Sequence, residues 1–282
     1  MFSKVLGIAT AFLASSLSLF AAVPPSKHVV LVVEENHSYS SVINNSAMPY
    51  FNSLARNYSL LTNYYANTHP SIGNYFKMTT GQIITNNDSF SGTVSADNII
   101  RELLPLAKTW KSYAESLPYP GYLGLSSGAY LKRHNPIAFF TDVANSSVER
   151  QRLVPFTQFS KDLASQSLPT FSFIVPNVLH DAHSGSLAAA DYWLKTNIAP
   201  LFNDPQFKKD GILIIVFDES FDSDTSHGGG HVAAIVVGPH VKRGYRSTQF
   251  FQHQSLLATI LDAFGTAPDP GSASTAPAFN VF

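Results

Sequence analysis

Residues 211–219 have the sequence GILIIVFDE, an apolar run that begins at a glycine and ends in two acids. A short run so rich in Ile and Val predicts a strand that is covered on both faces. Three other runs have the same character: HVVLVVEEN (28–36), TFSFIVPN (170–177) and HVAAIVVGP (231–239). Each ends in Gly, Pro, Asn or an acid, which is typical of buried strands. Together they predict the centre of a mostly parallel sheet.

Helical patterns of apolar residues lie between these runs. They occupy residues 49–59, 154–165, 186–202 and 253–265. Alternation of strands with helices is typical of a layered α/β/α arrangement. We therefore predict one catalytic domain of the α/β class over residues 23–282.

Residues 82–153 differ from the rest of the chain. They are rich in Tyr, Ser, Asn, Gly and Pro and show little periodicity, which predicts a small inserted lobe over the sheet. The tail, GTAPDPGSASTAPAFNVF (265–282), is low in complexity. We expect it to be loose, with its last apolar residues able to dock.

The composition excludes several classes of chemistry. The chain has 282 residues, no cysteine and a formal net charge of −1. A thiolate nucleophile and a Cys-ligated metal are excluded, so any metal must be held by oxygen or imidazole ligands. Because there is no basic excess, no nucleic-acid partner is predicted.

The first 22 residues resemble a targeting segment. Lys4 precedes an uncharged run from Val5 to Ala22, and small residues close that run. This pattern predicts a secretory signal peptide over residues 1–22, and hence a secreted or periplasmic protein. An uncleaved membrane anchor is the alternative, because the run is close to the length of a span. No later segment is long and apolar enough to span a membrane.

Polar residues gather where the predicted strands end, which is where open α/β sheets bind their ligands. His231 begins its run instead. However, residues 220–230 have no helical pattern, so a long hairpin would join the last two strands and return His231 to the same edge. The residues predicted at this edge are Glu35, Asn36, Asp181, His183, Asp218, Glu219 and His231.

These side chains are hard oxygen and nitrogen ligands. Adjacent carboxylates such as Asp218 and Glu219 repel one another unless a cation lies between them. Their clustering predicts a site for one or two divalent metal ions. For any single member, an exposed loop acid or a hydrogen-bonded histidine is the alternative.

The segment NTHPSIGNYFKMTTG (67–81) predicts a helix that starts at Pro70 and ends at Gly81. Ser71 then lies in the first turn, where free amides and the helix dipole favour an anion. A hydroxyl there can attack phosphorus while the amides hold the phosphate oxygens. The alternative is that Thr68 or Ser71 only caps the helix.

Taken in order, these segments resemble the motifs of the bacterial phosphoesterase family. That family contains secreted acid phosphatases and phosphatidylcholine-type phospholipases C, and it belongs to the alkaline-phosphatase superfamily. The segments span residues 28–265 and are VVEENHSYS, HPSIGNYFKMTTG, KRHNPIAFF, PNVLHDAHSGS, IIVFDE and HVAAIVVGPHVKRG. The resemblance implies an alkaline-phosphatase-like core and hydrolysis of phosphate esters.

The resemblance also implies roles for single residues. Ser71 matches the nucleophile, which also contacts the metal, and Asn74 matches a phosphate-oxygen donor. Glu35 matches a metal ligand, and Asn36 a ligand or phosphate contact. His134 matches a histidine at the substrate. The further metal ligands implied are Asp181, His183, Asp218, Glu219 and His231.

The chain departs from the family pattern at two places. Gly73 stands where family members commonly have Pro. The stretch SFDSDTSHGGGH (220–231) is unusually rich in Asp, His and Gly, so Asp222, Asp224 and His227 are further candidate ligands.

The predicted reaction is hydrolysis of a phosphate monoester through a phosphoserine at Ser71, with His134 or His183 protonating the leaving group. A phospholipase C or other diesterase on the same fold is the alternative, so the substrate is a small-molecule or lipid phosphate ester. A metal-free serine hydrolase could pair Ser71 with His183 or His231 and Asp218, but no G-x-S-x-G elbow surrounds Ser71. A non-catalytic exported binding protein is the remaining alternative.

Overall fold

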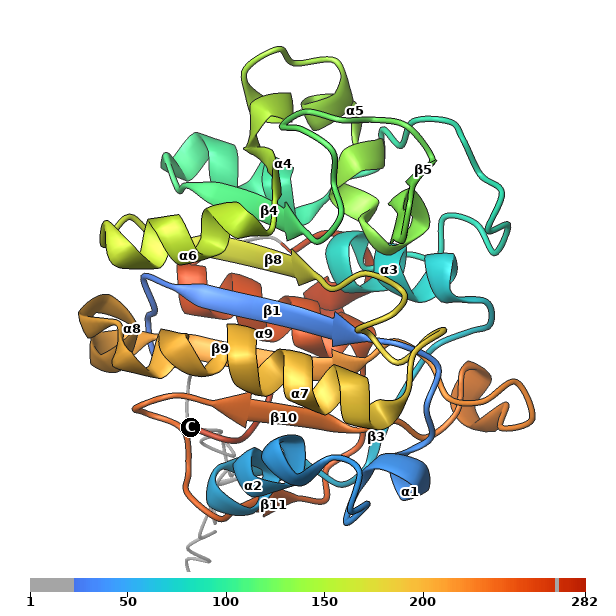
Figure 1. The fold of residues 1–282 in the computed structure, drawn as a ribbon, viewed down its shortest axis with the longest axis vertical. Helices are drawn as coiled ribbons and strands as arrows, with labels where there is room; N and C mark the ends of the chain where they lie inside the picture. The colour runs from blue at the N-terminus through green and yellow to red at the C-terminus, as the bar shows by residue number, and fades with distance from the viewer. Residues whose placement is uncertain (1–22, 267–268) are drawn as a thin grey trace, which may run out of the picture.

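The computed structural model describes residues 23–266 and 269–282, and its centre is an eight-stranded sheet (Figure 1). The strand order is β11-β2-β10-β9-β1-β8-β4-β7. The strands are β1 (Val29–Glu34), β2 (Ser59–Leu61), β4 (Trp110–Ala114), β7 (Leu153–Pro155), β8 (Phe171–Val175), β9 (Ile212–Phe217), β10 (Ala234–Val237) and β11 (Arg246–Ser247). Two small ribbons pair β3 (Tyr64–Tyr65) with β12 (Phe251–Gln252) and β5 (Ser126–Ser127) with β6 (Tyr130–Leu131).

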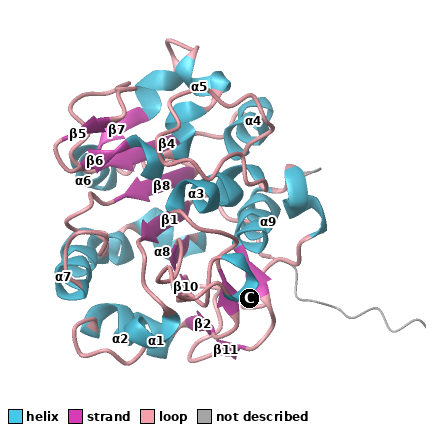
Figure 2. Cartoon of the chain, turned by 90° about the vertical axis from the view of Figure 1, so that its right-hand side faces the viewer, coloured by secondary structure: helices cyan, strands magenta, loops and turns pink. Residues whose placement is uncertain are grey.

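Helices cover both faces of this sheet. The helices are α1 (Tyr39–Val42), α2 (Pro49–Asn57), α3 (Ser71–Thr80), α4 (Ile99–Leu103), α5 (Thr141–Ala144), α6 (Thr157–Ala164), α7 (Leu187–Asn197), α8 (Pro205–Asp210) and α9 (His253–Phe264). Figure 2 shows α2, α6 and α7 on one side of the strands and α3, α4 and α9 on the other. The predicted α/β/α layering with a mostly parallel sheet is confirmed. Among the described residues, no helix combines the length and apolar character of a membrane span.

The four predicted strands form β1, β8, β9 and β10. Every residue of the central strands β1 and β9 is buried, as their uninterrupted apolar character predicts. β1 runs parallel to both β8 and β9, whereas β10 runs antiparallel to β9 and β2. The predicted hairpin between β9 and β10 is therefore confirmed. It brings residues 218–231 to the edge at which β1 ends.

The stretch predicted as an inserted lobe, residues 82–153, is not separate from the sheet. It supplies β4, which pairs in parallel with β8, and it ends at the edge strand β7. Lys111 and Ser112 interrupt the apolar pattern of β4 and hide it in the sequence. Both are satisfied by buried partners, because Lys111 Nζ donates to Asp162 at 2.6 Å and Ser112 Oγ donates to Asn135 at 2.8 Å.

The tail is docked rather than loose. Phe279 and Val281 are buried, and the amide of Phe279 donates to Thr259 Oγ1 of α9 at 2.8 Å. Lys77 in α3 donates to Ser272 Oγ at 2.7 Å. The predicted leader, residues 1–22, lies outside the described residues.

Candidate active site

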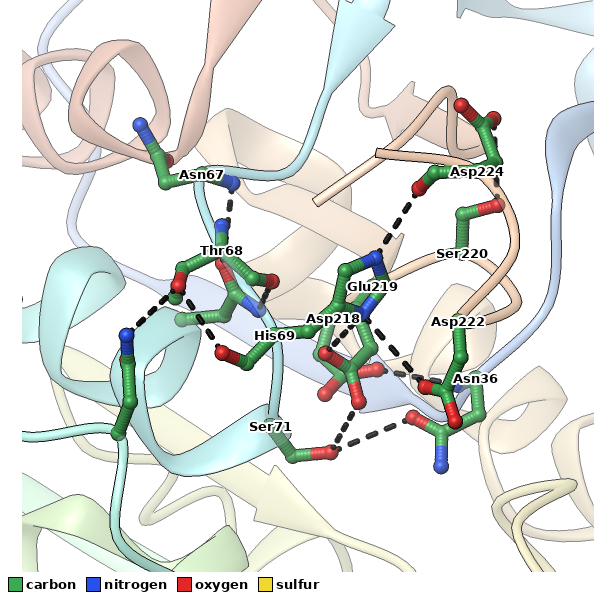
Figure 3. Close-up of polar contacts among 12 residues, drawn as sticks. Asn36, Asn67, Thr68, His69, Ser71, Asp218, Glu219, Ser220, Asp222 and Asp224 are labelled. Carbon is green, nitrogen blue, oxygen red and sulfur yellow. Dashed lines mark hydrogen bonds and ion pairs between the residues drawn. The ribbon is translucent and has the colours of Figure 1, made fainter. Parts of the chain in front are cut away.

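Ser71 is the first residue of α3, and its hydroxyl points toward Glu219 and Asn36 (Figure 3). Its Oγ lies 2.9 Å from Glu35 Oε2, 3.0 Å from Glu219 Oε1 and 3.3 Å from Asn36 Oδ1. Glu35 and Asn36 directly follow β1, and Glu219 follows β9 by two residues. The position in the first helical turn and the convergence on the sheet edge both agree with the predictions.

The capping alternative for this helix is wrong. Pro70 is the residue before the first turn, and no side chain caps the helix. The hydroxyl of Thr68 donates to the carbonyl of His69, and that of Ser71 faces the carboxylates. The Ser71 hydroxyl is therefore placed for a role other than ending a helix.

Too many acceptors surround the Ser71 hydroxyl for the one proton that it carries. Glu35, Glu219 and Asn36 all present oxygens to it. The Asn36 amide oxygen faces only acceptors, and turning the amide would bring its nitrogen within 2.9 Å of Glu219 Oε1 and 3.2 Å of Glu35 Oε2. In the turned orientation Asn36 donates to both carboxylates, and the carboxylate oxygens remain as ligands for a hard divalent ion.

The pKa values of the acids also fit a cation at this site. Burial raises the pKa of Glu35 and of Asp218 well above their ordinary values, and the neighbouring acids raise both further. Burial, reinforced by Asp222, raises the pKa of Glu219 to about 8. Burial also raises the pKa of Asp181 to about 7. The protein alone therefore disfavours these carboxylates as anions, and a bound cation would reverse the preference.

A second group of candidate ligands adjoins the first through Glu35. His134 Nε2 lies 3.4 Å from Glu35 Oε1, and His134 Nδ1 lies 3.5 Å from Asp181 Oδ2. The Tyr75 hydroxyl donates to Glu35 Oε1, and its ring stacks on His134. Neither His134 Nε2 nor Asp181 Oδ2 has a hydrogen-bond partner, although both atoms are buried. A metal ion would satisfy both of these unpartnered atoms, since imidazole nitrogen and carboxylate oxygen are both metal ligands.

His183 lies at the rim of the site. Its amide donates to Asp181 Oδ1 at 2.8 Å, and its ring centroid is 5.7 Å from that of His134. Burial lowers the pKa of half-buried His183 and lowers that of fully buried His134 to about 3. Both imidazoles are therefore neutral at pH 7.

His231 is not brought to the carboxylates. Its ring stacks between Tyr39 and Tyr65, with centroids 4.3 and 4.8 Å away, and its Nε2 lies 3.1 Å from the carbonyl oxygen of Thr62. The hairpin does return His231 to the predicted edge. The aromatic stack then turns the ring away from the acids, which the spacing of the residues could not reveal.

Asn74 also differs from its implied role as a phosphate donor. Its Oδ1 accepts from the amides of Asn67 and Thr68 at 3.0 and 3.2 Å, and its Nδ2 donates to the carbonyl of Thr68 at 2.7 Å. The side chain is fully buried and committed to the backbone. Asn74 therefore shapes the loop that leads to the nucleophile.

His69 is a site residue that sequence reasoning missed. Its Nδ1 lies 2.8 Å from Glu219 Oε2, and its Nε2 lies 3.0 Å from the carbonyl oxygen of Asp224. Both ring nitrogens therefore face oxygen atoms. Asp222, which is exposed, lies 3.8 Å from His69, so His69, Glu219 and Asp222 form a second candidate metal group beside Glu35, His134 and Asp181.

The other two loop candidates have structural contacts. Asp224 accepts from the amides of Ser226 and His231, both at 3.0 Å. The ring of His227 packs against Tyr65 at 4.4 Å. Neither residue belongs to a group of ligand atoms among the described residues.

The buried side chain of His253 contacts the backbone of Asp218, the first residue of the Asp218–Glu219 pair. His253, at the start of α9, places Nε2 2.6 Å from the backbone oxygen of Asp218 and Nδ1 2.9 Å from the Tyr64 hydroxyl. A carbonyl oxygen only accepts, so Nε2 carries the proton and Nδ1 accepts from Tyr64. The start of the 253–265 helical pattern could have signalled a polar group at this edge.

A glycine run fastens the hairpin loop to the segment before the nucleophile. A Cβ added to Gly228 would lie 2.0 Å from the carbonyl oxygen of Asn67. One added to Gly229 would lie 2.5 Å from the carbonyl oxygen of Thr68. Gly230 has a φ of +83° and its amide donates to the carbonyl of Ser226. Only glycine lets the two backbones approach so closely.

Comparisons with known proteins agree with this architecture. A sequence model of the Phosphoesterase family matches residues 41–267. The chain is 33% identical over 260 residues to a phosphatidylinositol-3-phosphatase of Mycobacterium tuberculosis, covering 91% of this chain and 83% of that protein. It is 31% identical to an acid phosphatase of Aspergillus fumigatus over 73% of this chain, but spans only about half (48%) of that longer protein.

A solved structure shows the same fold. It is a protein of the alkaline phosphatase superfamily from Vibrio parahaemolyticus, which superposes with a TM-score of 0.60 at 15% identity and covers 86% of this chain and 68% of its own. At that identity the likeness concerns the fold alone.

Proposed function

Because the chain belongs to the Phosphoesterase family, and is therefore a phosphoric ester hydrolase, we propose that it hydrolyses phosphate monoesters through Ser71 with a bound divalent cation. The observation that supports this proposal is the contact of the Ser71 hydroxyl with Glu35 and Glu219 at the start of α3. The catalytic domain would comprise residues 23–282.

Glu35, Asn36, Asp218 and Glu219 would hold the cation, with His134 and Asp181 as the ligands available for a second. Such an ion neutralises phosphate charge and makes a hydroxyl more acidic. These side chains fit it because their oxygens converge without enough protons to satisfy one another.

Ser71 would act as the nucleophile. Its Oγ attacks phosphorus, the bond from phosphorus to the leaving oxygen breaks, and the hydroxyl proton passes to Glu219 or Glu35. The positive end of the α3 dipole would face the phosphate oxygens. Water then attacks the phosphoserine, releases phosphate and restores the Ser71 hydroxyl.

Of the two histidines expected to protonate the leaving oxygen, His183 is favoured. His134 is fully buried and its pKa is about 3, whereas His183 is half-buried at the rim, where the leaving group would depart. Because burial lowers the pKa of His183, its acid form is populated only under acidic conditions. This favours an acidic pH optimum, as a general acid must be protonated to act.

The substrate could be soluble or lipid-borne. The mycobacterial relative is named a phosphatidylinositol-3-phosphatase, so a phosphate group carried by a lipid is a candidate substrate for the same chemistry. A phospholipase C or other diesterase is the alternative activity. A metal-free serine hydrolase is disfavoured, because no imidazole among the described residues is hydrogen-bonded to the Ser71 hydroxyl.

Export is a separate part of the proposal, supported by the pattern of residues 1–22. The mature protein should begin between about Ala21 and Ser26. N-terminal sequencing of exported protein checks this, and retention of Met1 would contradict it.

The decisive experiment measures phosphate release from an aryl monoester, an aryl diester and phosphatidylcholine, with and without chelator. Ser71→Ala should lose about a thousandfold or more in kcat, as deletions of other serine nucleophiles do. The matched control is Ser160→Ala, at an exposed serine of α6, which should keep full activity. Acid quenching with labelled substrate should trap phosphate on the Ser71 peptide. Full activity in Ser71→Ala, with inversion at a chiral phosphorus, would instead show direct attack by water.

A further inference from the structure

Arg133 is a cation at the mouth of an otherwise acidic site, and the reaction proposed above does not use it. It lies in the short 3-10 helix Lys132–His134, directly before His134. Its Nη2 is 3.4 Å from His183 Nε2. Its Nε is buried and has no hydrogen-bond partner among the described residues, and the side chain is 25% exposed. The donors left for a ligand are therefore those of the Nη end of the guanidinium.

Asp88 lies beside Nε of Arg133 and connects this side chain to α3, the helix that begins at Ser71. Its Oδ2 lies 3.6 Å from Arg133 Nε, and its Oδ1 accepts from the amide of Ile72 at 3.4 Å. Ile72 directly follows Ser71. Asp88 therefore lies between Arg133 and the start of α3. Among the described residues, Arg133 forms no hydrogen bond or ion pair with Ser71, Glu35 or Glu219. It is placed to touch the part of a substrate that extends beyond the transferred phosphate.

A hollow opens beside Arg133. It has a volume of about 190 Å³ and a mixed lining: apolar side chains from Phe90, Leu125, Leu131 and Phe139, the polar Ser126, and Arg133 and Asp88 as its charged end. A dry cavity of roughly 150 Å³ is large enough for benzene, so a substituted ring fits here. Lys132 Nζ lies 4.2 Å from the centroid of the Phe139 ring, which adds positive charge to that wall.

We propose that this hollow, the Arg133 pocket, receives the leaving group of the ester, and that Arg133 recognises an anionic substituent on it, a carboxylate or a second phosphate. The inference rests on the proposed phosphatase reaction and names its substrate class. A guanidinium fork binds such oxyanions in two parallel hydrogen bonds, and Asp88 orients the fork from its Nε side. The walls accept the carbon skeleton between the two charges.

The test compares three aryl phosphates that differ at the para position: carboxylate, the neutral carboxamide, and a second phosphate. The measured quantity is the ratio of kcat/KM for each anionic ester to that for the carboxamide. In Arg133→Gln both ratios should fall about tenfold, a modest effect for a charge-assisted hydrogen bond because the side chain is partly exposed. Comparing ratios between enzymes cancels the intrinsic reactivity of each leaving group. A fall for only one anion identifies which source the pocket accepts.

Two further variants make the test independent of one substitution. Leu125→Asp, at an exposed position in the wall, should lower the same ratios by repulsion. Arg56→Gln, an exposed arginine of α2, is the matched control and should leave them unchanged.

Three results would overturn the inference. Unchanged ratios in both Arg133→Gln and Leu125→Asp would remove the pocket from recognition. An equal loss of kcat/KM for all three esters in Arg133→Gln would place Arg133 on the transferred phosphate or on its contact with His183, and not on the leaving group. Wild-type protein that hydrolyses none of the three would refute the proposed function itself, and the inference with it.

Discussion

Removal of the divalent cation should make the protein less stable as the pH rises from 6 to 8. The reason lies in Glu219 and Asp181, whose folded-state pKa values of about 8 and about 7 stand above their ordinary values of 4.5 and 3.8. A carboxyl with a raised folded pKa contributes full stability below its unfolded pKa. That contribution is lost as the pH rises through the folded pKa. The loss for these two groups falls within a pH range that is easily studied.

The magnitude follows from the protons held by the folded state alone. Each such proton lowers the free energy of unfolding by about 1.4 kcal/mol per pH unit. Between pH 6 and pH 8 Glu219 holds most of a proton and Asp181 about half of one, so these two groups alone account for a loss of about 4 kcal/mol. For a domain of this size that corresponds to a fall in Tm of roughly 8–16 °C.

Thermal and urea unfolding of chelator-treated protein at pH 6, 7 and 8 measures this loss. Saturating divalent cation should flatten the pH dependence, because it stabilises the ionised carboxylates. Glu219→Gln should remove about 2 kcal/mol of this loss in the metal-free protein, because that is the share of Glu219 between pH 6 and pH 8. Metal-free protein that is equally stable at pH 6 and pH 8, or more stable at pH 8, would refute the reasoning.

Three other outcomes are expected. Asp218→Asn should abolish activity and metal binding together, as measured by kcat and elemental analysis; loss of activity with full metal content would separate the two. His253→Ala should cost about 10- to 100-fold in metal affinity or kcat by releasing the Asp218 backbone, whereas His253→Gln, which can still donate to that carbonyl, should retain most of it. Aryl monoesters should show a higher kcat/KM than phosphatidylcholine, and the reverse order in side-by-side assays would make the diesterase alternative the better description.

The strand–helix alternation predicted most of the fold because the central strands are apolar throughout. Apolar runs such as residues 211–219 are typical of buried strands. β4 was not predicted because Lys111 and Ser112 interrupt its apolar pattern. Their hydrogen-bond partners, Asp162 and Asn135, lie far away in sequence. A buried charge that is satisfied at long range leaves no local signal.

The site was predictable where residue type alone carries the chemistry. Ser71, Glu35 and Glu219 converge as expected, since strand ends and a helix start fix their backbone positions. The orientations of His231 and Asn74 were not predictable. One ring is held by an aromatic stack and the other side chain by three backbone hydrogen bonds, and neither arrangement has a signature in spacing.

The glycine run at 228–230 has a consequence for how this chain can change. None of the three carries a functional group, yet Gly228 and Gly229 set the gap between the hairpin loop and residues 67–68, and Gly230, with a positive φ, lies close to Ser220 and Asp224. In a saturation-mutagenesis library scored for activity, they should therefore tolerate replacement as poorly as the acids themselves. Neighbouring exposed positions such as Ser223 and Thr225 should accept most side chains. A map of tolerated substitutions would therefore show few accepted replacements at residues 228–230, although these three glycines bear no reactive atom.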